Sequence, residues 1–140
     1  MPVIGVYAPA GTFRDRAKLA RDLATAVMTI ERVPNIPLFR QNTAAFVHEL
    51  PPDSLSNVDG ESACVRVQVL TNAGGLDREK QVNVVAELTR IVAAAAIEPR
   101  LAERTWVLLT ELPDGGWGLG GRAHTNTELV AGARKQLGKR

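Results

Sequence analysis

An internal duplication constrains the fold of this chain more than any other feature of its sequence. Compared with itself at an offset of 62, which pairs Val3 with Val65, the sequence of 140 residues gives ten identical pairs without a gap. Only two copies occur, and the period is longer than the roughly 20–50 residues of repeat arrays, so the chain is predicted to be a fused pair of units. We assign the first unit to residues 1–62, the second to 63–124 and a closing helix to 125–140. The ten pairs are Val3/Val65, Asp15/Asp77, Arg16/Arg78, Lys18/Lys80, Ala24/Ala86, Pro37/Pro99, Thr43/Thr105, Glu49/Glu111, Leu50/Leu112 and Pro51/Pro113.

The first copy predicts a strand, a helix and a second strand. Residues 3–8 are short, apolar and β-branched, and residues 43–50 return as a strand after two prolines have ended the helix. Thr12 with Asp15 three residues later is typical of a capping pair that opens a helix. Apolar residues then recur at helical spacing and are predicted to face the core. They are Leu19, Leu23, Val27 and Ile30.

The second copy repeats this order. Strands are predicted over residues 64–70 and 104–112, with a helix over 77–96 between them. The residues of that helix predicted to face the core are Val82, Val85, Leu88 and Val92.

Two strand–helix–strand units define the expected fold class. A crossover through a long helix makes the flanking strands parallel and the connection right-handed. We therefore expect an α/β protein: duplicated β-α-β units forming a four-stranded mixed sheet with two helices on one face, plus a C-terminal hairpin and helix. The other face of the sheet would be bare, and a domain of this size normally covers such a face by oligomerising.

Composition and charge exclude several functions. The net charge of +2 is mild and comes partly from the basic C-terminal end, so we expect no nucleic-acid partner. Cys64 is the only cysteine, and no signal peptide or membrane-length apolar segment is present, which favours a cytoplasmic protein without membrane association. His48 and His124, the only histidines, have no cysteine or acidic residue at ligand spacing, so no metal site is predicted.

The second residue of the chain is a candidate catalytic group. If Met1 is removed, Pro2 becomes a secondary amine at the start of a strand, able to accept and to donate a proton. An α-amino group titrates near pKa ~8, and burial or a nearby cation lowers that value. Pro2 could then be a general base at neutral pH.

A glycine-rich segment follows the last long strand. Residues 116–121 match the pattern G-x-G-x-x-G, but the chain ends nineteen residues later, without the return strand and acidic residue that dinucleotide binding requires. We interpret the segment as a small hairpin that presents Trp117. Thr125 and Glu128 have the spacing of a capping box that opens the last helix.

Together these features resemble the tautomerase superfamily, the group that contains 4-oxalocrotonate tautomerase, malonate semialdehyde decarboxylase and cis-3-chloroacrylic acid dehalogenase. The resemblance covers nearly the whole chain and rests on Pro2, the duplicated unit, the strand at 106–113 and the glycine-rich tail at 115–121. It implies a homotrimer without a cofactor, with Pro2 as the acid–base centre and Trp117 lining the site. It also implies a keto–enol tautomerase acting on a small 2-oxo or enol acid.

The residues that bind substrate in these relatives are replaced here. The arginines of the dehalogenase and the decarboxylase are expected in the loop at 71–76, which contains no arginine. A carboxylate-bearing substrate still needs a cation, and the candidates are Arg14, Arg40 and Arg122. The alternatives are therefore a non-catalytic trimer that binds a small molecule or a protein, and a divergent dehalogenase- or decarboxylase-like enzyme.

Overall fold

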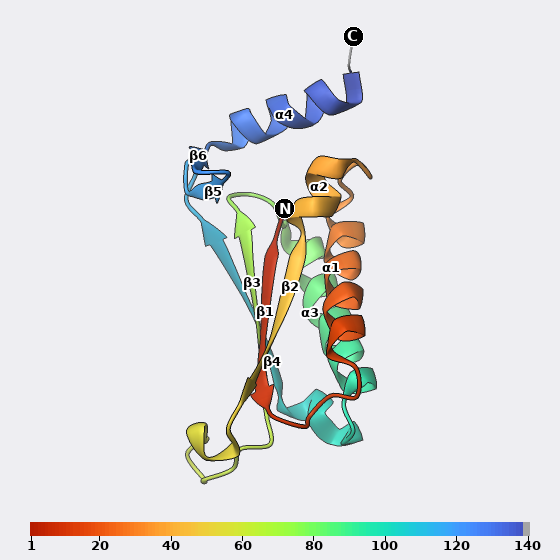
Figure 1. The fold of residues 1–140 in the computed structure, drawn as a ribbon, viewed down its shortest axis with the longest axis vertical. Helices are drawn as coiled ribbons and strands as arrows, with labels where there is room; N and C mark the ends of the chain where they lie inside the picture. Colours follow the sequence, from red (N-terminus) through yellow and green to blue (C-terminus); the bar gives the residue numbers. More distant parts are fainter. Residues whose placement is uncertain (139–140) are drawn as a thin grey trace.

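Four strands in the order β2-β1-β3-β4 form the sheet at the centre of the molecule (Figure 1). The structure is a computed structural model and describes residues 1–138. β1 is parallel to β2, β3 is parallel to β4, and the central β1–β3 pair is antiparallel. The mixed sheet predicted from the duplication is therefore confirmed, with the two units joined edge to edge. The strands are β1 (Val3–Pro9), β2 (Ala44–Leu50), β3 (Val65–Asn72) and β4 (Thr105–Leu112).

Two long helices cover one face of this sheet (Figure 1). They are α1 (Arg16–Glu31) and α3 (Arg78–Ala95). Both begin in the same way: Asp15 accepts a hydrogen bond from the Lys18 amide, and Asp77 accepts one from the Lys80 amide. The prediction that Thr12 opens α1 is wrong, because its hydroxyl donates instead to the Pro9 carbonyl at 2.6 Å, within the preceding turn.

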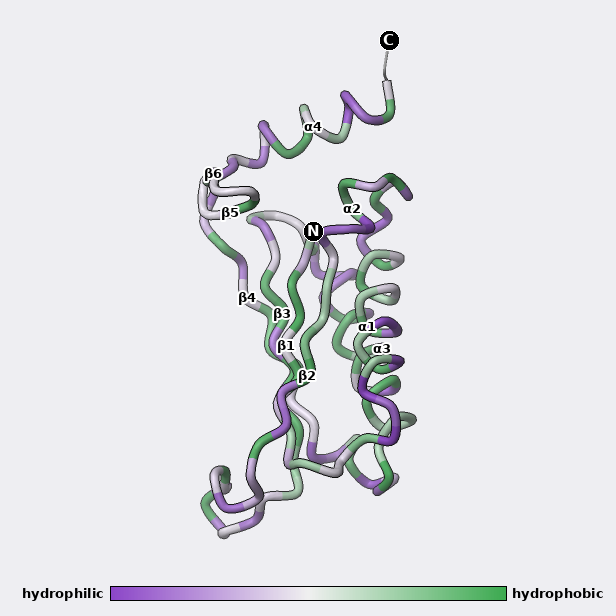
Figure 2. The backbone as a smooth tube through the Cα atoms, in the orientation of Figure 1, coloured by the Kyte–Doolittle hydropathy of each residue, from purple (hydrophilic) through white to green (hydrophobic). Residues whose placement is uncertain are grey.

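The core lies between the helices and the sheet. Ile4 and Val6 of β1 and Val67 of β3 are fully buried, in alternation with residues that face the other way. In Figure 2 the hydrophilic colour lies mainly on the outer turns of the helices and on the loops. The α1 prediction is confirmed for Leu19, Leu23 and Val27, which are buried, and Ile30 packs partly buried against them.

The inward face of α3 was predicted wrongly in part. Leu88 and Val92 are buried, but Val82 and Val85 are half-exposed and line a shallow groove with Leu109. Val84 faces the core in their place. The buried stripe of α3 begins seven residues after its capping aspartate, against four in α1. Apolar residues on two sides of α3 hid this shift.

The opposite face of the sheet is not covered by any described element. Large apolar side chains are about half-exposed on it: Phe46 at 56%, Trp106 at 50% and Leu108 at 47%. Between them Tyr7 stacks on His48, with ring centroids 4.4 Å apart, and the Arg66 guanidinium lies 4.3 Å from the centre of the Tyr7 ring.

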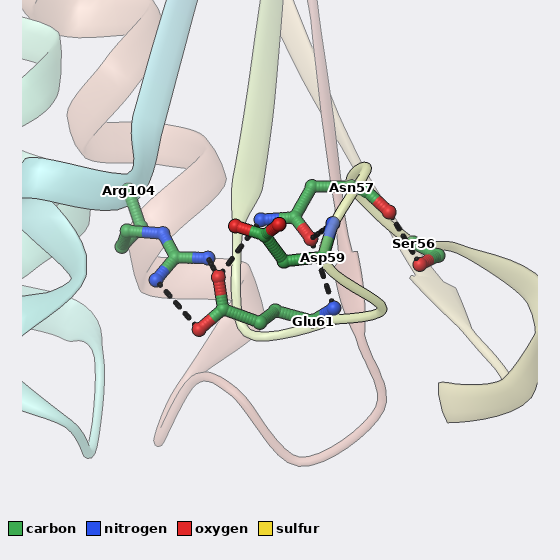
Figure 3. Close-up of polar contacts among 5 residues, drawn as sticks. All are labelled: Ser56, Asn57, Asp59, Glu61 and Arg104. Atoms are coloured by element: carbon green, nitrogen blue, oxygen red, sulfur yellow. Dashed lines mark hydrogen bonds and ion pairs between the residues drawn. The ribbon is translucent and has the colours of Figure 1, made fainter.

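Short elements occupy the two ends of the sheet. At the lower end in Figure 1, the loop that joins the two units is organised by Asn57, whose side-chain oxygen accepts from the amides of Asp59 and Glu61 (Figure 3). Glu61 then pairs with Arg104 at 3.0 Å, which ties the loop to the second unit (Figure 3). The two short helices of this end are η1 (Pro52–Ser54) and η2 (Pro99–Arg104).

The other end carries α2 (Pro37–Asn42), which the sequence did not predict, and the C-terminal elements. The predicted glycine-rich hairpin is confirmed as β5 (Trp117–Leu119) paired with β6 (Arg122–His124). The helix α4 (Asn126–Gly138) follows, and the Glu128 amide donates to the Thr125 hydroxyl at 3.2 Å, as the capping box requires. Among residues 1–138, no helix is long and apolar enough to cross a membrane.

Candidate functional site at the amino end of β1

The amino terminus is buried at the end of the central strand β1. Pro2 is buried, and its carbonyl accepts a hydrogen bond from the Ala44 amide at 3.3 Å, so β2 fixes the start of β1. The Met1 ammonium lies 3.7 Å from Oε2 of Glu31, and the two side chains are 1% and 3% exposed. A buried terminal amine facing a buried carboxyl is unusual, because charged groups are rarely removed from water.

The helix geometry explains why Glu31 points inward. Leu19, Leu23 and Val27 form the buried stripe of α1, and Glu31 occupies the next position at the same spacing of four residues. It is the last residue of the helix, because Arg32 adopts a left-handed conformation with φ 60°. The sequence therefore places a carboxyl where the stripe calls for an apolar residue.

Burial shifts the titration of both partners. Loss of hydration raises the pKa of Glu31, and the nearby amine and Lys80 only partly oppose this. Loss of hydration also lowers the pKa of the terminal amine below its usual 8.0, with Glu31 opposing. Burial thus displaces both the Met1 amine and the Glu31 carboxyl toward their neutral forms.

An apolar cluster surrounds the first residue on its other side. Met1, Trp117 and Leu129 are buried against one another, at 3%, 7% and 9% exposure, and we call them the Met1 cluster. Leu38 and Phe39 of α2 pack against it. The first residue therefore lies between an apolar wall and a carboxyl.

Hydrogen bonds hold the C-terminal elements over this end of the sheet. The Asn126 side chain donates to the Ala73 carbonyl at 2.9 Å, and Gln136 accepts from the Leu38 amide at 3.0 Å. A groove of about 560 Å³ lies between α2 and α4, lined by Leu38, Gly132, Lys135 and Gln136. Because Leu38 belongs to both the groove and the surroundings of the Met1 cluster, the groove opens beside the cluster.

Of the site residues predicted from the sequence, Trp117, Arg40 and Arg122 lie at the same end of the molecule as Pro2, and Arg14 lies at the other end of β1. Trp117 packs against Met1, next to Pro2 in the chain. Arg40 is exposed on α2, where its guanidinium donates to Asn35, and Arg122 is exposed on β6. Arg14 is exposed beyond the far end of β1, which at ~3.3 Å per residue is about 20 Å from Pro2 in the same protomer.

The groove between the two long helices is not lined by Met1 or Pro2. A groove of about 1010 Å³ runs between α1 and α3 on the outer surface, with Arg14 on its lining and exposed ion pairs such as Lys18–Asp22 at its edges. No cluster of three or more potential metal ligands occurs among residues 1–138.

Comparison with known proteins supports a fold assignment. No family model matches the sequence, and no curated protein matches it. Solved structures do. A fused 4-OT described as a symmetric trimer has a TM-score of 0.72 and 21% identity, over 91% of this chain and 98% of that one. A native fused 4-OT gives a TM-score of 0.70 at 21% identity, covering 86% of this chain and 94% of the other. This chain therefore has the fold of these fused 4-OT structures. A member of the cis-3-chloroacrylic acid dehalogenase family also matches, with a TM-score of 0.72 and 20% identity over 92% and 89% of the two chains.

Two polar residues near the amino terminus were not predicted from the sequence. Glu31 could have been found, since it continues a stripe of three apolar residues at a spacing of four. Thr43, which is 7% exposed and directly precedes Ala44, gave no such signal, because threonine at the start of a strand is ordinary.

Proposed function

We propose that this protein is a keto–enol tautomerase of the amino-terminal proline type, with Pro2 as general acid and base once Met1 has been removed. The observation that carries the proposal is the buried amino terminus, which lies between the carboxyl of Glu31 and the wall formed by Trp117. Pro2 would take a proton from the carbon next to a carbonyl and return it elsewhere. The substrate is a small 2-oxo or enol acid, as the resemblance implies.

The carboxylate of such a substrate needs a cation. Arg40 and Arg122 lie on the elements that surround the amino terminus, so they are the better candidates within one protomer. Arg14 could serve only from a neighbouring subunit, given its distance along β1. The assembly is proposed to be a homotrimer, supported by the bare apolar sheet face and by the trimeric fused 4-OT structures.

The experiment compares proteins whose first residue is verified by intact mass. Protein beginning at Pro2 should ketonise phenylenolpyruvate or 2-hydroxymuconate, followed by loss of enol absorbance. Pro2→Ala should lower the rate about 10²–10⁴-fold, the usual contribution of general acid–base catalysis. Pro9→Ala, at the opposite end of the same strand, is the matched control and should keep the rate. Equal rates for Pro2→Ala and the unaltered protein would refute the proposal.

A non-catalytic binding protein is the second candidate. The observation that favours it is the Met1 side chain itself, which fills the space beside Trp117 and leaves Pro2 as an amide. This candidate predicts that Met1 is retained in protein purified without a tag, and that no enol acid is turned over in a Pro2-dependent way.

A further inference from the structure

Two buried polar atoms without a hydrogen-bond partner mark the amino end of β1. Among residues 1–138, the buried side-chain atoms that lack a partner are Oε1 of Glu31 and Oγ1 of Thr43. Glu31 faces the amine, and Thr43 precedes the residue that is hydrogen-bonded to Pro2. Buried polar groups are nearly always satisfied, so two orphaned atoms at the same end of the sheet point to a missing polar occupant.

The second copy of the unit provides an internal comparison. At the opposite end of the sheet, Cys64 stands where Pro2 stands and is 7% exposed, and the counterpart of Glu31 at the offset of 62 is Ala93 of α3, which is partly buried. Thr105, the counterpart of Thr43, donates its hydroxyl to the Leu101 carbonyl at 2.5 Å. In the second unit, apolar side chains and a hydrogen-bonded threonine therefore occupy the corresponding positions. The fold itself does not require a carboxyl at position 31.

Of the cations near Glu31, the terminal amine is the one that pairs with its carboxyl. Lys80 of α3 is the other cation that acts on it, but its ammonium donates to the main-chain carbonyl of Glu31 at 3.0 Å, and the structure shows no hydrogen bond from it to the carboxyl. Arg32, next in the chain, pairs with Glu79 at 3.1 Å on the surface. The carboxyl therefore faces the amine on one side and has an unused oxygen on the other.

Met1 indicates the space that a substrate would take. Its amine contacts Glu31, and its side chain packs against Trp117 and Leu129. The Pro2 nitrogen is three covalent bonds from the Met1 nitrogen, so it lies ~3–4 Å away. When Met1 is removed, the vacated space has the Pro2 amine and the Glu31 carboxyl on its polar side and apolar side chains on the other.

We infer that Glu31 is a catalytic residue that exchanges a proton with the substrate oxygen while Pro2 exchanges a proton with the substrate carbon. This inference rests on the proposed tautomerase function. In ketonisation, the Pro2 ammonium gives its proton to the enol carbon, which uses the C=C electron pair to form the new C–H bond. The enol O–H bond breaks, its electrons form the C=O bond, and its proton goes to the Glu31 carboxylate.

Pro2 and Glu31 return to their starting protonation states without another proton donor or acceptor. The product leaves a neutral Pro2 amine and a protonated Glu31, and one proton transfer between these neighbours restores the starting state. No proton is gained or lost overall, and no cofactor is needed.

The Glu31 carboxylate also restricts how the substrate can be oriented. The oxygen next to Glu31 must be a hydroxyl or a carbonyl, because a second carboxylate beside this buried one would be repelled. The apolar part of the substrate would lie against Trp117 and Leu129. A substrate carboxylate must point away from Glu31, so the chemical class is a small enol or ketone whose reacting oxygen is uncharged.

The experiment uses protein beginning at Pro2 and two variants of matched chemistry. Glu31→Gln removes the buried carboxylate with little change in shape, and Glu79→Gln makes the same change at an exposed glutamate. Phenylenolpyruvate ketonisation should fall about 10²–10⁴-fold in Glu31→Gln and stay unchanged in Glu79→Gln. Glu31→Asp, which keeps the charge, should recover part of the rate.

A second measurement separates this inference from the proposed function. The pKa of the Pro2 amine, titrated by NMR with labelled proline, should fall by about 1–3 units in Glu31→Gln, because an opposite charge nearby favours the ammonium. The same amine pKa in both proteins, or full activity of Glu31→Gln, would overturn the role of Glu31. If the unaltered protein turns over no substrate, the proposed function fails, whereas a lowered amine pKa would still establish the Glu31–Pro2 pair.

Discussion

Removing Met1 is expected to lower the free energy of unfolding by about 2 kcal/mol. Met1 is only 3% exposed and packs against Trp117 and Leu129. Complete burial of a side chain of this size contributes ~1.5–3 kcal/mol. The chain still begins with an amine, which moves from Met1 to Pro2, ~3–4 Å along the chain. The apolar contribution should therefore dominate the difference, so the form with Pro2 at its terminus should be the less stable one.

The assay is urea denaturation of two proteins that differ only in their first residue. A cleavable tag is removed so that either Met1 or Pro2 begins the chain, and intact mass verifies each product. With a urea dependence of ~1–3 kcal/mol/M, the midpoint should fall by about 1 M. Both proteins are measured at one concentration, since assembly would shift apparent stability. Val58→Ala, at a fully exposed position, is the control and should change stability by less than ~0.5 kcal/mol. Identical midpoints would refute the packing of Met1 described above.

Three further predictions concern charge, helix capping and assembly. Because burial raises the pKa of Glu31 above 4.5, the folded state keeps a proton that the unfolded state loses, so stability should fall as pH rises from about 4.5 through the folded pKa. The lowered pKa of the Met1 amine should make stability rise again toward pH 8.0. In urea denaturation measured across this pH range, Glu31→Gln should not show the fall in stability above pH 4.5. Asp15→Ala and Asp77→Ala should each cost about 1 kcal/mol by thermal denaturation, because both aspartates cap a long helix, and an unchanged melting temperature would contradict those caps. Trp106→Glu should reduce the assembled mass measured by light scattering, because it places a charge on the bare sheet face, and an unchanged mass would exclude that face as the interface.

The duplication made much of the fold predictable. Strand positions and the order of elements followed from short apolar segments that recur at one offset, and Asp15 and Asp77 perform the same capping role in both copies. The inward face of α3 was less accessible, because Val82 and Val85 make an apolar flank beside the true core stripe. Sequence periodicity reports which faces are apolar but does not distinguish a face that meets the sheet from one that meets an edge.

The candidate site was predictable only where a residue has its own chemical signature. Pro2 follows from its position and Trp117 from the glycine-rich hairpin around it. The spacing of the α1 stripe indicates that Glu31 faces inward, but its position beside the amino terminus depends on how the helix packs on the sheet. Closeness in sequence was also misleading for Arg14. It follows β1 closely in sequence, but the length of that strand separates it from Pro2.

The closing helix α4 is attached lightly to the rest of the molecule. Leu129 and Ala133 are its buried residues, and Figure 1 shows it lying beyond the end of the sheet, near α2. Local opening takes the least free energy where few apolar contacts must be broken, so amide hydrogens of α4 should exchange with solvent long before those of the central strands. A molecule bound beside Trp117 and Leu129 would add contacts to α4 and oppose its local opening. Protection of α4 in hydrogen exchange is therefore a direct reading of occupancy, and it requires no knowledge of the chemistry that follows.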